Sequence, residues 1–213
     1  YAKIEHLDFE VWIWIKDLGL GAHGHQDNGN SIIFWKGQPL IIDSGRLDYT
    51  KDEISQKQIG VKGHFIPYPI DLEEEWDFFP GSPLSNNPYF KSSISIEEKK
   101  NKIIVSLTNW NSKLEVKRTF LLLDDELVIL DESVEGGRFH TNLIFPYNKK
   151  YIEKKSDSIF IEDIELHIDT GHSKNEIKVS ESEYSPSYGI LNKGSLLVSE
   201  LSNKTKYVLK LRK

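Results

Sequence analysis

Short apolar runs, separated by turn-forming residues, recur along the chain. The runs are rich in Ile, Val, Leu, Phe, Trp and Tyr, and clusters of Gly, Pro, Asn and Asp separate them. This pattern predicts β-strands joined by turns, because β-branched and aromatic side chains suit a pleated sheet. The strands that we predict are Phe9–Ile15, Asn30–Trp35, Pro39–Ile42, Ile103–Asn109, Leu114–Leu122, Leu127–Val134, Phe139–Phe145, Ser158–Ile161, Ile164–Ile168, Leu196–Leu201 and Thr205–Leu211.

Apolar and polar residues alternate within several of these runs. In Leu114–Leu122 and Ile164–Ile168 the apolar side chains fall mainly at every second position, so one face of each strand is directed at a core and the other at solvent. No window of ten or more residues repeats with the period of a helix. We therefore expect one helical turn at most, at Glu53–Gln58.

Turn-forming residues between the runs predict the hairpins. The turns that we expect are Lys36-Gly37, Asp124-Asp125, Gly136-Gly137 and Asn192-Lys193-Gly194. About a dozen closely spaced strands predict an all-β fold, a large antiparallel β-sandwich that spans residues 1–213 as a single domain. The exception is Tyr49 to Tyr89, a long stretch with prolines and little strand pattern, which is typical of a functional or disordered loop.

The composition narrows the class of protein. Hydrophobic residues make up 38% of the chain and charged residues 28%, as in globular domains. The net charge of −6 is mild, and lysines are mixed with acidic residues, so the basic stripe that duplex nucleic acid requires is missing. No apolar run approaches the ~20 residues of a membrane-spanning helix. We therefore expect no nucleic acid and no membrane among the partners.

The chain has no cysteine, so it can form no disulfide and no thiolate zinc site. Any bound metal must use His, Asp or Glu. The chain also begins at Tyr1, lacks methionine and has no charged leader segment. We therefore expect it to be part of a longer polypeptide, whose signal peptide or upstream domain is missing.

Two histidines and two aspartates around a predicted hairpin form the main chemical signal. His23 and His25 lie two residues apart in a glycine-rich segment, and Asp27 follows them. A turn near Gly37 folds the strand that ends at Asp43 back beside the region that follows His25, because residues equally far before and after a hairpin turn pair with each other. We therefore expect Asp43 and His25 to be neighbours.

His64, in the long irregular stretch, is free to fold over the same place. Two imidazoles and a carboxylate are a common ligand set for Zn²⁺, with a fourth position open to water. A short His-x-His pattern also occurs in polar loops that bind nothing. A cupin-type metalloprotein is a further alternative, but its first motif needs a Glu where this chain has Gly29 or Asn30, and neither can be that ligand.

The segment HGHQDNGNSIIFWKGQPLIIDSGRLDY resembles the signature of the heparinase II/III-like family of polysaccharide lyases. In that family a His-x-His-x-Asp segment leads into a strand, a Gly turn and an apolar strand that ends in Asp-x-Gly, with a Tyr soon after. Val116–Ser133 is similar to the family's Arg-bearing strand and the next strand, which ends in Asp. Ser185–Gly189 is similar to a late Ser-x-x-Tyr-Gly element. The resemblance covers most of the chain, in the right order.

The resemblance implies a C-terminal β-sandwich domain, often called a supersandwich, preceded in full-length proteins by a helical α/α-toroid. The substrate cleft lies between the two. Members cleave acidic polysaccharides such as heparan sulfate or alginate by β-elimination, which requires a neutralised uronate carboxylate, a base for the C5 proton and an acid for the leaving O4. The resemblance also implies a periplasmic or extracellular location.

The resemblance assigns roles position by position. His23 matches a histidine that faces the substrate and Tyr49 a tyrosine near the cleft, so these two are the candidate catalytic residues. His25 and Asp43 match ligands of a structural Zn²⁺. His64 matches the third ligand if the segment KGHF corresponds to the family's His-Asn element, although Phe stands here where Asn is usual.

The isolated domain is expected to have little activity, because the usual acid/base tyrosine of several members lies in the toroid. One alternative from another class stays open. The chain could be a non-catalytic carbohydrate-binding or assembly domain that keeps the sandwich and the metal.

Overall fold

The structure is a computed structural model, which describes residues 1–15, 25, 27, 29–48, 50, 52–69, 91–99, 102–110, 115–133, 138–170, 177–202 and 204–211. Its strands are β1 (Ala2–His6), β2 (Phe9–Ile13), β3 (Ser31–Trp35), β4 (Gln38–Ile41), β5 (Pro67–Pro69), β6 (Lys91–Lys99), β7 (Lys102–Trp110), β8 (Glu115–Leu123), β9 (Glu126–Ser133), β10 (Arg138–Phe145), β11 (Ile152–Lys155), β12 (Ser158–Ile161), β13 (Ile164–Asp169), β14 (Lys178–Ser187), β15 (Ile190–Ser202) and β16 (Lys204–Leu211). The helical elements are α1 (Glu53–Ile59) and the 3-10 turns η1 (Val61–Gly63) and η4 (Lys149–Tyr151).

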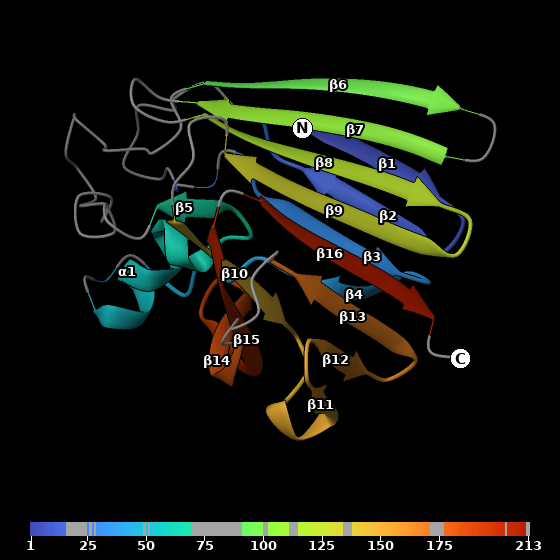
Figure 1. Ribbon diagram of the computed structural model, residues 1–213. Helices are drawn as coiled ribbons and strands as arrows, with labels where there is room; N and C mark the ends of the chain where they lie inside the picture. Colours follow the sequence, from blue (N-terminus) through green and yellow to red (C-terminus); the bar gives the residue numbers. More distant parts are fainter. Residues whose placement is uncertain are drawn as a thin grey trace.

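The strands form three antiparallel sheets (Figure 1). The large sheet has eight strands in the order β11-β12-β13-β16-β9-β8-β7-β6. The other two sheets have four strands each, in the orders β1-β2-β3-β4 and β14-β15-β10-β5. The predicted all-β fold, a large antiparallel sandwich, is confirmed.

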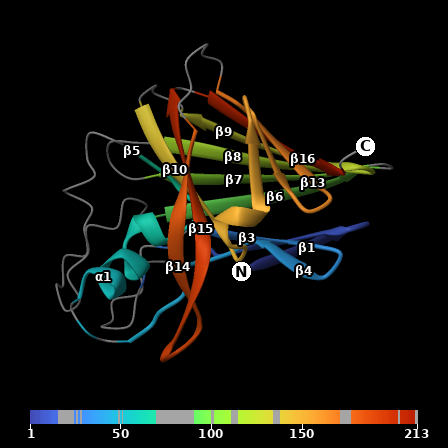
Figure 2. The same ribbon diagram turned by 90° about the horizontal axis from the view of Figure 1, so that it is seen from below.

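The sheet β1–β4 packs on the large sheet to form the main core. Figure 2 shows the blue strands of the first sheet as a layer beneath the green strands of the second. Val11, Ile33 and Ile41 of the small sheet share one buried cluster with Phe120 and Ile129 of the large one. Each such side chain, when fully buried, stabilises the fold by roughly 1.5–3 kcal/mol. This two-layer core is the frame on which the site is built.

The third sheet is joined to this frame by the chain that leaves β4. Ile42 forms an isolated bridge with Ile144 of β10, and Gly45 forms one with Ser185 of β14. The short strand β5, which follows α1 and η1, pairs with the other side of β10. The segment between Ile42 and β5 therefore runs from the sandwich into the third sheet.

Several details of the sequence-based prediction are confirmed. β8 and β13 bury mainly every second residue, which is the alternation expected for strands with one face on a core. Lys36-Gly37 connects β3 to β4, and Asp124-Asp125 connects β8 to β9.

Two predicted hairpin turns are wrong. Asn192-Lys193-Gly194 lies inside β15, and Tyr188-Gly189 forms the turn after β14 instead. Gly194 is needed for close packing, since a Cβ there would stand 2.5 Å from the carbonyl oxygen of Phe145. Gly136-Gly137 lies outside the described residues, but the flanking strands β9 and β10 belong to different sheets and form no hairpin.

Helix α1 has seven residues, more than the single turn predicted. The Asp52 carboxylate caps its first turn by accepting a hydrogen bond from the N–H of Ser55 over 2.8 Å. Burial of Gln58 and Ile59 then holds the second turn, a tertiary effect that periodicity over so few residues does not reveal. In the described parts of the chain, no helix is long and apolar enough to cross a membrane.

The sequence does not predict five of the strands. Four of them, β1, β6, β11 and β14, are rich in charged or hydroxyl side chains, and β5 contains two prolines. These strands lie at sheet edges, where polar residues and proline are tolerated because one side of the backbone has no neighbouring strand.

Candidate metal centre

The hairpin β3–β4 places Asp43 beside Asn30. Lys36 and Gly37 form its two-residue turn, with φ of 49° and 74°, and this left-handed pair matches the twist of the flanking strands. Nδ2 of Asn30 donates a hydrogen bond to Oδ2 of Asp43 over 2.5 Å. The return of Asp43 to the region that follows His25, which the sequence predicts, is therefore present in the structure.

The carboxylate of Asp43 accepts three hydrogen bonds. Besides that of Asn30, it receives the backbone N–H of Gly45 over 2.7 Å and Nδ1 of His64 over 2.6 Å. Burial would raise the pKa of this carboxyl, but the charge and hydrogen bond of His64 and the N–H of Gly45 outweigh burial and hold the pKa below its usual value. Asp43 is therefore ionised at neutral pH.

Strand β14 holds the loop that follows Asp43. The backbone N–H of Ser185 donates to the carbonyl oxygen of Ser44 over 2.7 Å, and the Ser185 hydroxyl lies 3.1 Å from the carbonyl oxygen of Arg46 and 2.8 Å from those of Ser187 and Ile190. Gly45, between Ser44 and Arg46, has a φ of 70° that a side chain would strain. The late Ser-x-x-Tyr-Gly element thus packs on the Asp-x-Gly element.

His64 follows η1, and its ring is completely buried. Burial would lower the pKa of the ring, but the charge and hydrogen bond of Asp43 outweigh burial and raise it. The other ring nitrogen, Nε2, makes no hydrogen bond of normal geometry among the described residues, although the backbone of Ile59 is close enough to raise the pKa of the ring. A buried polar atom without a partner costs roughly 1–3 kcal/mol, so such an atom points to a water or an ion.

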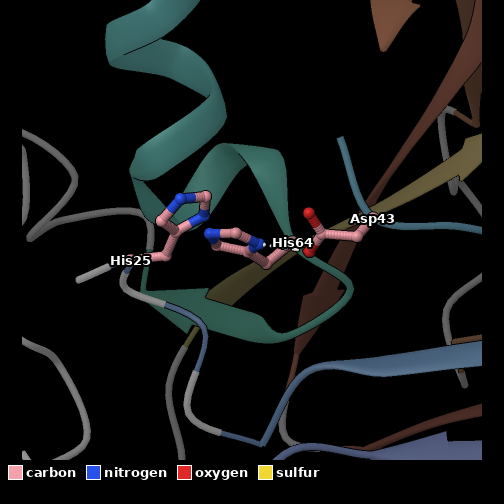
Figure 3. A group of neighbouring side chains, drawn as sticks. All are labelled: His25, Asp43 and His64. Atoms are coloured by element: carbon pink, nitrogen blue, oxygen red, sulfur yellow. Dashed lines mark hydrogen bonds and ion pairs between the residues drawn. The ribbon is translucent and has the colours of Figure 1, made fainter. Parts of the chain in front are cut away.

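The side chains of His25, His64 and Asp43 lie close together, with His64 hydrogen-bonded to Asp43 (Figure 3). The two ring centroids are 5.5 Å apart. Burial, together with the charge of His64, lowers the pKa of His25 to about 4, which leaves its ring neutral at neutral pH. One donor atom from each of the three residues lies within 4.8 Å of the others. We call these residues the His25–Asp43–His64 cluster.

The cluster fits a zinc ion by the chemistry of its donors. Neutral imidazole and ionised carboxylate are ligands that Zn²⁺ prefers, at bond lengths of about 2.0–2.2 Å. Two donors on one such ion are at most about 4 Å apart, so these donors, which lie within 4.8 Å of one another, would have to move closer together to share an ion. An ion in the cluster could also supply the partner that the buried Nε2 of His64 lacks.

The other predicted site residues have different outcomes. Asp27 lies near enough for its charge to raise the pKa of His25 and of His64, but it is not one of the three clustered donors. His23 and Tyr49, the candidate catalytic residues, lie outside the described residues.

Sequence reasoning missed the role of Asn30. The sequence places this residue at the start of the predicted strand Asn30–Trp35 and at a position where the cupin motif would need a Glu, and gives it no further role. The signal that could have found it is an amide side chain directly before the first strand of the hairpin, level with the aspartate that ends the second strand.

No family model matches the chain, and no curated protein sequence matches it. Solved structures do. A heparinase III superposes with a TM-score of 0.74 at 16% identity, over 100% of this chain and 36% of that one. Heparan sulfate lyase HepC from Pedobacter heparinus superposes with a TM-score of 0.72 at 15% identity, over 95% of this chain and 33% of that one. The chain has the fold of one part of heparinase III.

This shared fold confirms the β-sandwich that the sequence resemblance implies. A mutant of chondroitin AC lyase from Streptomyces coelicolor A3 is also similar, with a TM-score of 0.54 at 11% identity over 98% of this chain and 31% of that one. The chain spans about a third of the length of these lyases.

Proposed function

We propose that this chain is the β-sandwich domain of a polysaccharide lyase that cleaves a uronic-acid-containing polysaccharide by β-elimination. One observation carries the proposal: the His25–Asp43–His64 cluster occurs in a fold shared with heparan sulfate lyase. Fold alone does not define a reaction, since one fold hosts many functions. The cluster of potential metal ligands adds evidence from the site itself and so narrows the choice of function.

The three residues of the cluster are proposed to hold a structural Zn²⁺. The ion would tie together three segments that are far apart in the sequence, one of which also carries His23. The low pKa of His25 and of Asp43 supports this assignment, because both groups are then deprotonated at neutral pH, whereas His64, whose pKa Asp43 raises, would release a proton as the ion binds.

His23, two residues before the ligand His25, is proposed to face the sugar, and Tyr49 to lie near the cleft. In β-elimination a base takes the C5 proton of the uronate, a double bond forms between C4 and C5, and the C4–O4 bond breaks. The departing O4 then receives a proton. A histidine suits either proton transfer, because its ordinary pKa of about 6.5 lies close to neutral pH.

An upstream α/α-toroid in the same polypeptide is proposed to form the other wall of the substrate cleft. The length of the chain supports this proposal, since the chain spans about a third of the length of the heparan sulfate lyase structures. We also propose a periplasmic or extracellular location, where a polymeric acidic substrate is accessible.

The lyase proposal is tested on the full-length polypeptide that contains this chain. The protein is incubated with a panel of uronic-acid polymers, and the ultraviolet absorbance of the unsaturated uronate product is followed. We expect absorbance to rise on at least one polymer, and to stay flat for His23→Ala with zinc content unchanged. Binding of a polymer without any rise in absorbance, across the whole panel, would overturn the lyase and favour a non-catalytic carbohydrate-binding domain.

A further inference from the structure

The side chain of Asn30 lies where the three segments of the cluster meet. It is 2% exposed and uses both ends of its amide. Nδ2 donates to Oδ2 of Asp43 over 2.5 Å, and Oδ1 accepts the backbone N–H of Phe65, the residue after His64, over 2.9 Å. One amide therefore links one member of the cluster to the immediate neighbour of another.

The backbone of Asn30 is itself fixed in the segment that carries the third cluster residue, His25. Its N–H donates to the carbonyl oxygen of Asp27 over 2.9 Å, and its carbonyl accepts the N–H of Trp14 over 2.9 Å. The amide thus extends from a rigid backbone rather than from a free loop.

Phe65 is held on its other side by the large sheet. Nη1 of Arg118 donates to the Phe65 carbonyl oxygen over 2.6 Å, and the guanidinium lies 4.0 Å from the centroid of the Phe65 ring. Asp131 fixes the guanidinium through two further bonds, of 2.6 Å to Nε and 2.8 Å to Nη2. Such bidentate pairs have a defined geometry. Both polar backbone groups of Phe65 are therefore bound by side chains, one from each layer of the sandwich.

We propose that Asn30 is a positioning residue, which sets the separation of Asp43 and His64 before an ion binds. The inference rests on the zinc site proposed above. An amide suits this position because it can donate to a carboxylate and accept from an N–H at the same time, which a carboxylate cannot do. Hydrogen bonds that orient metal ligands from outside typically change affinity by 10–100-fold when they are removed.

The test is zinc binding by Asn30→Ala, measured in competition with a chromophoric chelator on the metal-free protein. All three proposed ligands remain in this variant. We expect one zinc per chain at saturation, with affinity weakened by about 10–100-fold. Asn30→Ser, whose hydroxyl can keep one of the two bonds, is the second variant in case the first does not fold, and it should lie between wild type and Asn30→Ala.

The matched control is Ser195→Ala. Ser195 is also fully buried, and its hydroxyl donates to the carbonyl oxygen of Tyr147 over 2.8 Å, away from the cluster. The Ser195→Ala variant should have a lower unfolding temperature and an unchanged zinc affinity. Wild-type affinity in folded Asn30→Ala or Asn30→Ser would overturn the positioning role while the zinc site stands. A wild-type protein that binds no zinc would overturn both.

Discussion

Gly45 lies directly against the backbone of Ser185: a Cβ at position 45 would stand 1.9 Å from the Ser185 carbonyl oxygen. Because the obstacle is backbone, no side-chain rotation can relieve the clash. The N–H of Gly45 also donates to the carboxylate of Asp43, so the contact fixes one proposed zinc ligand.

Replacing Gly45 by Ala should therefore destabilise the fold strongly, by about 3 kcal/mol or more, because left-handed strain and a backbone clash act together. Urea unfolding followed by circular dichroism measures the change. Gly37→Ala is the matched control, since Gly37 has a similar φ of 74° but nothing within 4 Å of the added Cβ. Gly37→Ala should lower the free energy of unfolding only by the backbone strain, about 1–2 kcal/mol. Equal losses in the two variants would contradict the clash.

Removal of metal should lower the thermal stability. An ion that binds only the folded state stabilises it by about 2.7 kcal/mol when its concentration is a hundred times the dissociation constant. For a chain of this length that corresponds to a fall of roughly 5–10 °C in the unfolding temperature on chelation. Differential scanning calorimetry before and after dialysis against a chelator, and again after zinc is restored, tests this. Unchanged unfolding temperatures throughout would argue against a structural ion.

Replacing His25 by Ala should abolish stoichiometric zinc, as measured by atomic emission on purified protein, because the buried neutral ring is then lost as a donor. His167→Ala is the control, since this half-buried histidine lies on β13, where it contacts Ser158. It should retain zinc. Full zinc content in His25→Ala would remove this residue from the ligand set.

Asp43→Asn separates two roles of the carboxylate. The amide oxygen can still accept the hydrogen bond of His64, but an amide is a far weaker zinc ligand than a carboxylate. If Asp43 binds the ion, stoichiometric zinc is lost. If Asp43 only orients His64, zinc stays at one per chain with affinity lowered by about 10–100-fold. Titration with zinc distinguishes the two outcomes, and we expect stoichiometric zinc to be lost.

The buried pair Arg118 and Asp131 should behave asymmetrically on mutation. Arg118→Met leaves an unpaired buried carboxylate and should cost about 3–5 kcal/mol in the free energy of unfolding. The double variant Arg118→Met with Asp131→Leu removes both charges and should recover part of that loss, because the Phe65 carbonyl still lacks its Arg118 donor. Urea unfolding of the two variants compares them. A double variant no more stable than Arg118→Met would show that the pair's attraction, rather than the buried charge, sets the cost.

The sequence predicts the strands and the hairpin around the site better than the side-chain contacts within it. The hairpin turn at Gly37 and the alternating strands follow from local propensities, which is why the approach of Asp43 to the His25 segment can be predicted. The sequence also allows His64 to reach the site, and the resemblance matches it to the third ligand, but its place depends on α1 and η1. Local patterns cannot supply this place, because it results from packing against the third sheet.

The remaining contacts could not be predicted because they depend on register across two layers. The contacts of Asn30 with Phe65 and of Arg118 with the Phe65 carbonyl join residues that are 35 and 53 positions apart. Edge strands such as β6 and β14 were missed for a related reason: their neighbours, rather than their composition, make them strands.

The hydrogen bond from Arg118 to Phe65 also bears on the order in which the sandwich folds and zinc binds. All three proposed ligands lie within the first 64 residues and leave the ribosome before β8 and β9 have been synthesised. Until that hairpin docks, the carbonyl of Phe65 lacks the Arg118 donor, so one of the two side-chain bonds that hold the neighbour of His64 is missing. Zinc should therefore bind weakly to a nascent chain that ends before β9. The ion would then bind after the two layers of the sandwich have packed together, and it would not nucleate folding.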